Sequence, residues 1–342
     1  MKKLLTFVSA ITAGAIGTAS AEISIAGSSN FFYASGSGDV NSETNEETMS
    51  VVGGSMAFAM STETTNGVTV SSSLTVSANT DSVTTATNEG PALGGMTYIA
   101  FGMDGMTVTL GDINNAGSGT GGGGDVTSFA ATHTASVTTT TNNGAAGADA
   151  AMDGIADGTG INVATSMADV AVNATFVSTV GSGRNSLSAN TKTAGANSGY
   201  AIDLGFSALG ASVNVAAGGS SSQVAGTANS TAAGVEVSYP ASDVLTVSAG
   251  ASAGKLAGIE VDNMFVTAAY TMDADTTLSV GYSTKDNEDT TTVDEERMTT
   301  VNVSRSLGGG VSIFAEYASA DYDTDNTGSS GSSVALGTVV SF

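Results

Sequence analysis

The sequence predicts an all-β fold, a transmembrane barrel of sixteen antiparallel strands with short periplasmic turns and long outer loops. Three observations favour this fold. Apolar and polar residues alternate in short segments along nearly the whole chain, which is the pattern of half-buried strands. The first residues have the form of an export signal. The final strand alternates through Leu336 and Val340 to an aromatic end at Phe342.

The N-terminus predicts export. Lys2 and Lys3 provide a positive start, residues 4–16 are apolar, and residues 19–21 read Ala-Ser-Ala, a small-residue cleavage site. The apolar run is too short to span a bilayer as a helix. We therefore expect a signal peptide at residues 1–21 and a mature barrel at residues 22–342.

The composition excludes several function classes. There are 32 acidic residues against 8 basic ones, which argues against binding nucleic acid or anionic lipid. The absence of Cys rules out a disulfide framework and thiol chemistry. Charged residues make up 12% of the chain and aromatic residues 6%, so the chain is poor in both. Such a chain needs somewhere other than a large core for its apolar faces, and lipid provides it.

The strands can be counted from their turns. Asn66-Gly67 and Asp104-Gly105 are strong signals for tight hairpins. Five strands precede a long interruption and eleven follow it, which makes sixteen, an even number as in bacterial barrels. A barrel of that size leaves an aqueous channel. Weak alternation at residues 129–137 leaves a count of eighteen open.

Alternation also assigns the two faces of the strands. Lipid-facing charges are costly, about 2–4 kcal/mol for Lys or Arg at the bilayer midplane. The apolar side of each strand is therefore expected to face lipid and the other side to face the lumen. Arg297 and Arg305 are exceptions at the ends of their strand, where they can reach the interface. The charges predicted to face the lumen are Asp203, Glu236, Lys285 and Glu316.

The interruption covers residues 112–160. It has little alternation, and a loop of this length in a compact domain usually serves a function. Its charged residues are all acidic, with no Lys or Arg. These acids are Asp112, Asp125, Asp149, Asp153 and Asp157.

The mature chain resembles the sixteen-stranded general diffusion porins of Gram-negative bacteria, especially the alphaproteobacterial ones. The export signal, the strand count, the place of the long loop, the hairpin at residues 101–112 and the terminal Phe342 carry the resemblance. It implies an outer-membrane homotrimer through which small hydrophilic solutes diffuse passively. It also implies a third outer loop folded inward to constrict the pore, and a terminal aromatic that the barrel-assembly machinery reads.

The sequence departs from that family in its basic residues. The family has a basic cluster on its early strands opposite the acidic loop, whereas here no Lys or Arg occurs between Lys3 and Arg184. With acids on the loop and few bases to face them, we expect a pore that prefers cations. The five aspartates of residues 112–160 are the predicted constriction.

Other candidate sites are weaker. His133 is the only histidine and has no catalytic partner pattern. Asp321, Asp323 and Asp325 have a spacing that calcium loops use, but the bidentate Glu and the early Gly are missing, so calcium is a weak hypothesis and no other cofactor is implied. The alternatives are an exported acidic adhesin or surface-layer protein and, less favoured, an outer-membrane enzyme.

Overall fold

The fold is seen in a computed structural model, which describes fourteen segments of the chain. They are residues 21–38, 46–77, 92–94, 98–114, 116–128, 130, 151–152, 155–156, 158–180, 197–221, 228–256, 258–287, 295–323 and 329–342. The predicted signal peptide lies outside them, apart from Ala21, which begins the first strand. None of the helices in these segments is long and apolar enough to cross a membrane.

The described residues form strands along almost their whole length. Before the long loop lie β1 (Ala21–Gly38), β2 (Glu46–Glu63), β3 (Thr69–Ser77), β4 (Ala92–Gly94), β5 (Tyr98–Met103) and β6 (Met106–Ile113). After it come β7 (Gly158–Met167), β8 (Val170–Val180), β9 (Asn197–Ala208), β10 (Ala211–Ser221), β11 (Ser230–Ser242) and β12 (Leu245–Leu256). The chain ends with β13 (Ile259–Thr271), β14 (Thr276–Asn287), β15 (Glu295–Gly308), β16 (Val311–Asp323) and β17 (Ser329–Ser341).

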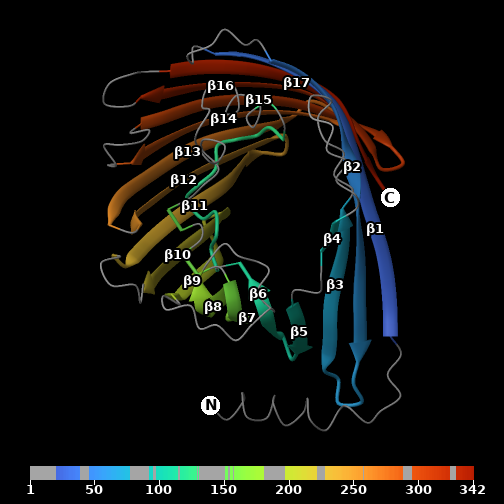
Figure 1. Ribbon diagram of the computed structural model, residues 1–342, viewed down its shortest axis with the longest axis vertical. Coiled ribbons are helices and arrows are strands. Elements are labelled where there is room, and N and C mark those ends of the chain that lie inside the picture. The colour runs from blue at the N-terminus through green and yellow to red at the C-terminus, as the bar shows by residue number, and fades with distance from the viewer. Residues whose placement is uncertain are drawn as a thin grey trace.

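These strands close into one antiparallel barrel (Figure 1). Apart from β4 with β5, each strand pairs with its neighbour in sequence, and β1 pairs with β17 to complete the ring. The short β4 and β5 both pair with β3, so the two share one place in the sheet. The barrel therefore has sixteen strands, five before the long loop and eleven after it, as predicted.

The end of the chain takes part in this closure. The backbone N–H of Gly27 donates to the carbonyl of Phe342 at 2.8 Å, and the N–H of Phe342 donates back to Gly27 at 3.0 Å. The Phe342 ring lies over Gly27, where an added Cβ would be 2.6 Å from the ring. The backbone and the ring of Phe342 thus hold the end of β17 against β1.

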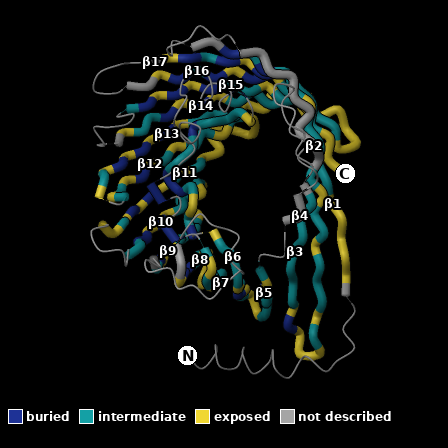
Figure 2. The backbone as a smooth tube through the Cα atoms, in the orientation of Figure 1, coloured by how far each residue is buried: buried dark blue, intermediate teal, exposed yellow. Residues whose placement is uncertain are grey.

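The two faces of the strands differ as alternation predicts (Figure 2). In β13, Met264 is 60% exposed on the outer side, whereas Asn263 and Phe265 between the outward positions are buried. The outward residues Tyr200, Ile202 and Tyr239 are exposed in the same way. Because lipid can cover such apolar side chains, few of them are buried by protein on the outer face. The buried side chains point mainly into the barrel.

The connections at one end of the barrel are tight turns. Asp104 and Gly105 have φ of 47° and 74°, and Leu209 and Gly210 have φ of 53° and 81°, as hairpin turns of the primed type require. The connections at the other end are longer, which matches the predicted asymmetry. The β12–β13 connection departs from it, because Leu256 and Ile259 pair directly and only residues 257–258 join the strands.

Candidate functional site

The described part of the long loop lies along the inner side of the barrel. Figure 1 shows the segment that follows β6 within the ring of strands. Its first anchor is Ala116, whose N–H donates to Thr175 Oγ1 of β8 at 2.9 Å. A second is Ala151, whose N–H donates to Ser252 Oγ of β12 at 2.9 Å. Backbone groups of the loop are therefore satisfied by inward-facing hydroxyls of the barrel.

Further along, the loop binds β15. Thr300 is fully buried, and its Oγ1 donates to the carbonyl of Gly124 at 2.9 Å. The same oxygen accepts the N–H of Val126 at 3.0 Å. One hydroxyl thus serves as both donor and acceptor and fixes the backbone on either side of Asp125.

The next contact is with β16. Both oxygens of the Glu316 carboxylate accept loop N–H groups, Oε1 from Ser128 at 2.8 Å and Oε2 from Ala130 at 3.2 Å. Asn302 of β15 donates to Oε1 at 2.9 Å. The hydroxyl of Ser333 on β17 donates to the carbonyl of Ala130. The described loop therefore has contacts from β8 to β17.

Glycines in the strands leave room for this backbone. A Cβ added at Gly234 would collide with the carbonyl of Thr120, and one added at Gly281 would collide with the carbonyl of Gly124. Any larger residue at these two positions would push the loop away from the barrel. The close approach of the loop to the barrel therefore depends on glycine at these two positions as well as on the hydrogen bonds.

Two small apolar clusters fill the space between loop and barrel. In the first, Met152 and Ile155 of the loop pack with Val177 of β8 and with alanines of β9 to β11. In the second, Ala130 packs with Met298 of β15 and with alanines of β16 and β17. Met152 and Ala130 are completely buried. The described interior therefore holds a thin core that attaches the loop.

Asp125 lies in the middle of this attached section. Its Oδ1 accepts hydrogen bonds from the N–H and the hydroxyl of Thr127, both at 2.7 Å. Burial raises the pKa of Asp125 above the ordinary carboxylate value, the Thr127 hydrogen bonds oppose that effect, and the negative charge of Glu316 adds to it. Asp125 is thus an acidic group on the inner side of the barrel, close to a second one.

The other predicted loop acids are not brought together with it in the described structure. β6 extends to Ile113, so Asp112 belongs to the barrel and not to the loop. It shares its side of β6 with Leu110, which is 41% exposed on the outer face. Asp149, Asp153 and Asp157 lie outside the described residues, as does His133.

The four predicted lumen charges occupy the inward side of their strands. Asp203 lies beneath the loop, and a Cβ added at Gly117 would be 3.3 Å from its Cβ. Glu236 is half-buried between the exposed, outward-facing Val235 and Val237. Lys285 lies opposite Glu296 of β15 in the strand register. Glu316 is 5% exposed, so it serves to bind the loop and presents little charge to water.

Sequence patterns did not identify the groups that hold the loop. Thr175, Ser252, Thr300 and Ser333 stand at inward positions, and their polarity is what alternation predicts for any lumen residue. Nothing in the spacing of such residues distinguishes a loop contact from a water contact. The glycines at 234 and 281 were the available signal, since Gly in a strand often marks a close backbone approach.

The calcium hypothesis stays untested. Asp321 lies in β16, Asp323 ends that strand, and Asp325 lies outside the described residues. Within the segments that the structure describes, no three His, Cys, Asp or Glu side chains group closely enough to hold a metal ion.

Both outward arginines have acidic neighbours at the ends of β15. Arg297 pairs with Glu295 at 2.6 Å, and Arg305 pairs with Asp273 at 3.6 Å. Asp273 belongs to the turn between β13 and β14, where its pKa is lowered first by the N–H of Asp275, with a smaller contribution from Arg305. The arginines are therefore paired at the rims, in agreement with their predicted place at the interface.

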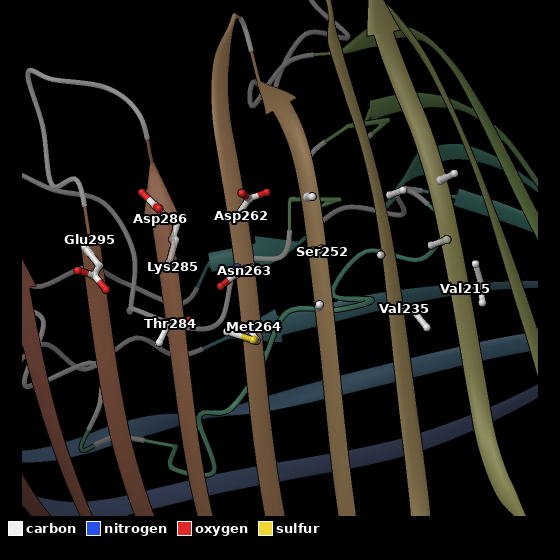
Figure 3. A pocket seen from close by; sticks show the side chains of 16 residues that line it. Val215, Val235, Ser252, Asp262, Asn263, Met264, Thr284, Lys285, Asp286 and Glu295 are labelled. Atoms are coloured by element: carbon white, nitrogen blue, oxygen red, sulfur yellow. The ribbon is translucent and has the colours of Figure 1, made fainter.

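A groove of about 730 Å³ lies over β10 to β15, and it is separate from the pore. Val215, Val235 and Met264, which line it, are exposed on the outer face of the barrel (Figure 3). The carboxylates Asp262 and Asp286 mark its long-loop end. The groove is thus part of the lipid-facing surface.

A closed sixteen-stranded antiparallel barrel with an apolar outer band and a polar interior defines the class of bacterial outer-membrane channels. The family model for Gram-negative porins matches residues 6–325, and the chain belongs to that family. Its function is therefore that of a non-enzymatic channel in the outer membrane. A comparison with curated proteins gave no match.

Solved structures share the fold. An anion-selective porin from Comamonas acidovorans has a TM-score of 0.66 at 11% identity, with 94% of this chain and 100% of that one covered. The outer-membrane channel DcaP of Acinetobacter baumannii has a TM-score of 0.64 at 11% identity, covering 94% and 97%. The trimer form of OmpT from Vibrio cholerae has a TM-score of 0.62 at 11% identity, covering 93% and 99%.

Proposed function

We propose that this porin is a channel for passive diffusion of small hydrophilic solutes and that it prefers cations. The observation that carries the proposal is the acidic loop section around Asp125, which lies along the inside of a barrel whose sequence has no Lys or Arg between Lys3 and Arg184. A fixed negative charge in a narrow aqueous aperture attracts cations and repels anions.

The charge of the lumen supports the same preference. Asp203 and Glu236 add carboxylates on the inward side of β9 and β11, while Lys285 is the one inward-facing base of the described strands and lies near the long-loop rim. The Comamonas acidovorans porin is described as anion-selective, but a likeness at 11% identity concerns the fold alone. Selectivity follows from the charges of each chain.

We also propose how the protein assembles and what the remaining aspartates do. The working form is a homotrimer, as in the trimer form of the Vibrio cholerae protein with the same fold. Residues 1–21 are removed as a signal peptide, and Phe342 is read by the assembly machinery before it pairs with Gly27. Asp149, Asp153 and Asp157 contribute to the constriction together with Asp125.

Permeation of three sugars of similar size tests the proposal. Liposomes containing the purified protein would be given glucosamine, glucose and glucuronate, which carry a positive, no and a negative charge. We expect glucosamine to enter fastest and glucuronate slowest, with the difference shrinking at high salt. Faster entry of glucuronate would overturn the cation preference, and no entry of glucose would overturn passive diffusion.

A further inference from the structure

Glu316 of β16 differs from the other inward charges because its carboxylate accepts hydrogen bonds from the loop. It is 5% exposed, and its two oxygens face three donors. Two are loop N–H groups, from Ser128 and Ala130, at 2.8 and 3.2 Å. The third is the side-chain amide of Asn302 on the neighbouring strand, at 2.9 Å.

The chemistry of this arrangement calls for a carboxylate. An ionised carboxylate only accepts hydrogen bonds, so both of its oxygens can face N–H groups. An amide in its place would turn an NH₂ group toward one of these donors and lose at least one bond. Hydrogen bonds to an ionised acceptor are also shorter and stronger than neutral ones. Glu316 is therefore matched to its site by charge as well as by length.

Neighbouring strands support the same stretch of loop. Ser333 of β17 donates to the carbonyl of Ala130, whose N–H donates to Glu316. Thr300 of β15 holds the backbone at Gly124 and Val126, two residues before Ser128. Asp125 lies between the two residues that Thr300 holds and three residues before Ser128, so Glu316 fixes the loop backbone on the C-terminal side of Asp125.

We infer that Glu316 is a positioning residue of the channel, which fixes the loop so that Asp125 keeps one place along the permeation path. The inference rests on the proposed function, because the place of Asp125 matters only if that loop borders the path of ions. Glu316 contributes to selectivity through the loop that it binds more than through its own charge, since it has little exposed surface.

The test compares Glu316→Gln with Glu236→Gln, which removes one charge from another inward position with no described hydrogen bond to the loop. Amide hydrogen exchange of the folded channel would be followed in a peptide covering residues 126–130. We expect exchange there to be at least about tenfold faster in Glu316→Gln, because at least one hydrogen bond to the carboxylate is lost. Glu236→Gln should leave it unchanged. Unchanged exchange in Glu316→Gln would overturn the inference.

Single-channel recording separates this inference from the proposed function. We expect larger current fluctuations in Glu316→Gln than in Glu236→Gln at the same salt, and equal fluctuations would contradict a positioning role. If exchange rises as expected but the unmodified channel prefers anions, the proposed selectivity is wrong and the anchoring by Glu316 stands. If Glu316→Gln does not fold, Thr300→Val, which removes the hydroxyl shared by Gly124 and Val126, should accelerate exchange of the same peptide. Unchanged exchange in that variant would overturn the inference.

Discussion

Among single residues, Asp125 is the described loop charge that we propose to act most directly on permeation. Replacing it as Asp125→Asn removes the charge and keeps the size of the side chain. A unit charge at about 4 Å stabilises a cation and destabilises an anion by about 1 kcal/mol each in water, so we expect the cation-to-anion permeability ratio to fall by up to about thirtyfold. The ratio would be obtained from reversal potentials in planar bilayers.

The control for this substitution is Asp104→Asn. Asp104 lies in a tight turn at φ 47°, a conformation that Asn adopts readily, and it is exposed at the short-turn end. The two variants lose the same charge from different places. Equal permeability ratios for both would mean that total charge, and not the loop, determines selectivity.

The raised pKa of Asp125 predicts how selectivity changes with pH. Burial and the charge of Glu316 favour the protonated form, so Asp125 should lose its charge at a pH above the ordinary Asp value of about 3.9. By linkage, the stabilisation of the docked loop by protonated Asp125 is fully present below the ordinary Asp pKa of about 3.9. It is lost as the pH rises through the higher pKa that Asp125 has in the folded channel. Reversal potentials measured at falling pH should show cation preference weakening first in the unmodified channel. If Asp125→Asn gave the same pH profile, another group would be responsible.

The inward residues also show what alternation can and cannot predict. It predicts an inward direction for Asp203, Glu236 and Glu316, because side-chain direction in a strand follows from parity alone. It could not predict that Glu316 accepts loop N–H groups, since a contact between residues 128 and 316 depends on the path of a loop without periodicity. Asp112 was counted as the first residue of the loop, whereas the structure places it in β6.

At the scale of elements, the close contact between loop and barrel can be tested by adding one methyl group. Gly281→Ala would place a Cβ against the carbonyl of Gly124. Overpacking of this kind costs about 1–3 kcal/mol, which here would act against the docked loop. We expect altered conductance in single-channel recording with little change in barrel melting.

Gly102→Ala provides the matched control. Gly102 is a strand glycine of β5 whose nearest atom to an added Cβ is that of Thr69, at an ordinary 3.8 Å. The same methyl group should therefore fit there without displacing anything. If both alanine variants altered conductance alike, the added bulk and not the loop contact would explain the effect.

Removing the loop is the stronger test at this scale. Replacing residues 116–156 by a short Gly-Ser linker should raise the conductance and reduce cation preference. The barrel should still form, because its strands keep their complete ladder from β1 to β17. Conductance and heat-modifiable mobility in detergent gels would be measured on the same preparation. A conductance equal to that of the intact channel would show that the loop is no constriction.

The elements were predictable to different degrees. Strands and tight turns follow from local chemistry, and the turns at Asn66-Gly67 and Asp104-Gly105 were predicted from their glycines. The division between β4 and β5 was not predicted, since residues 93–103 read as one strand. The path of the loop could not be predicted from the sequence, because its described anchors are four hydroxyls and one carboxylate on five different strands.

At the scale of the whole molecule, closure and charge act together. Pairing of β1 with β17 leaves no free sheet edge in the membrane, and the final backbone bonds between Gly27 and Phe342 complete it. The closed barrel then determines which charges face water. With 32 acidic and 8 basic residues and the loop along the inside, we expect a negative pore interior.

The reversal potential of the purified, full-length channel is the direct measure of its preference for cations. A planar bilayer would separate two potassium chloride solutions of tenfold different concentration, and the zero-current voltage would be measured. We expect a voltage of the sign produced by potassium permeating faster than chloride, and a shift toward zero in Asp125→Asn. A voltage of the opposite sign in the unmodified channel would contradict the preference for cations.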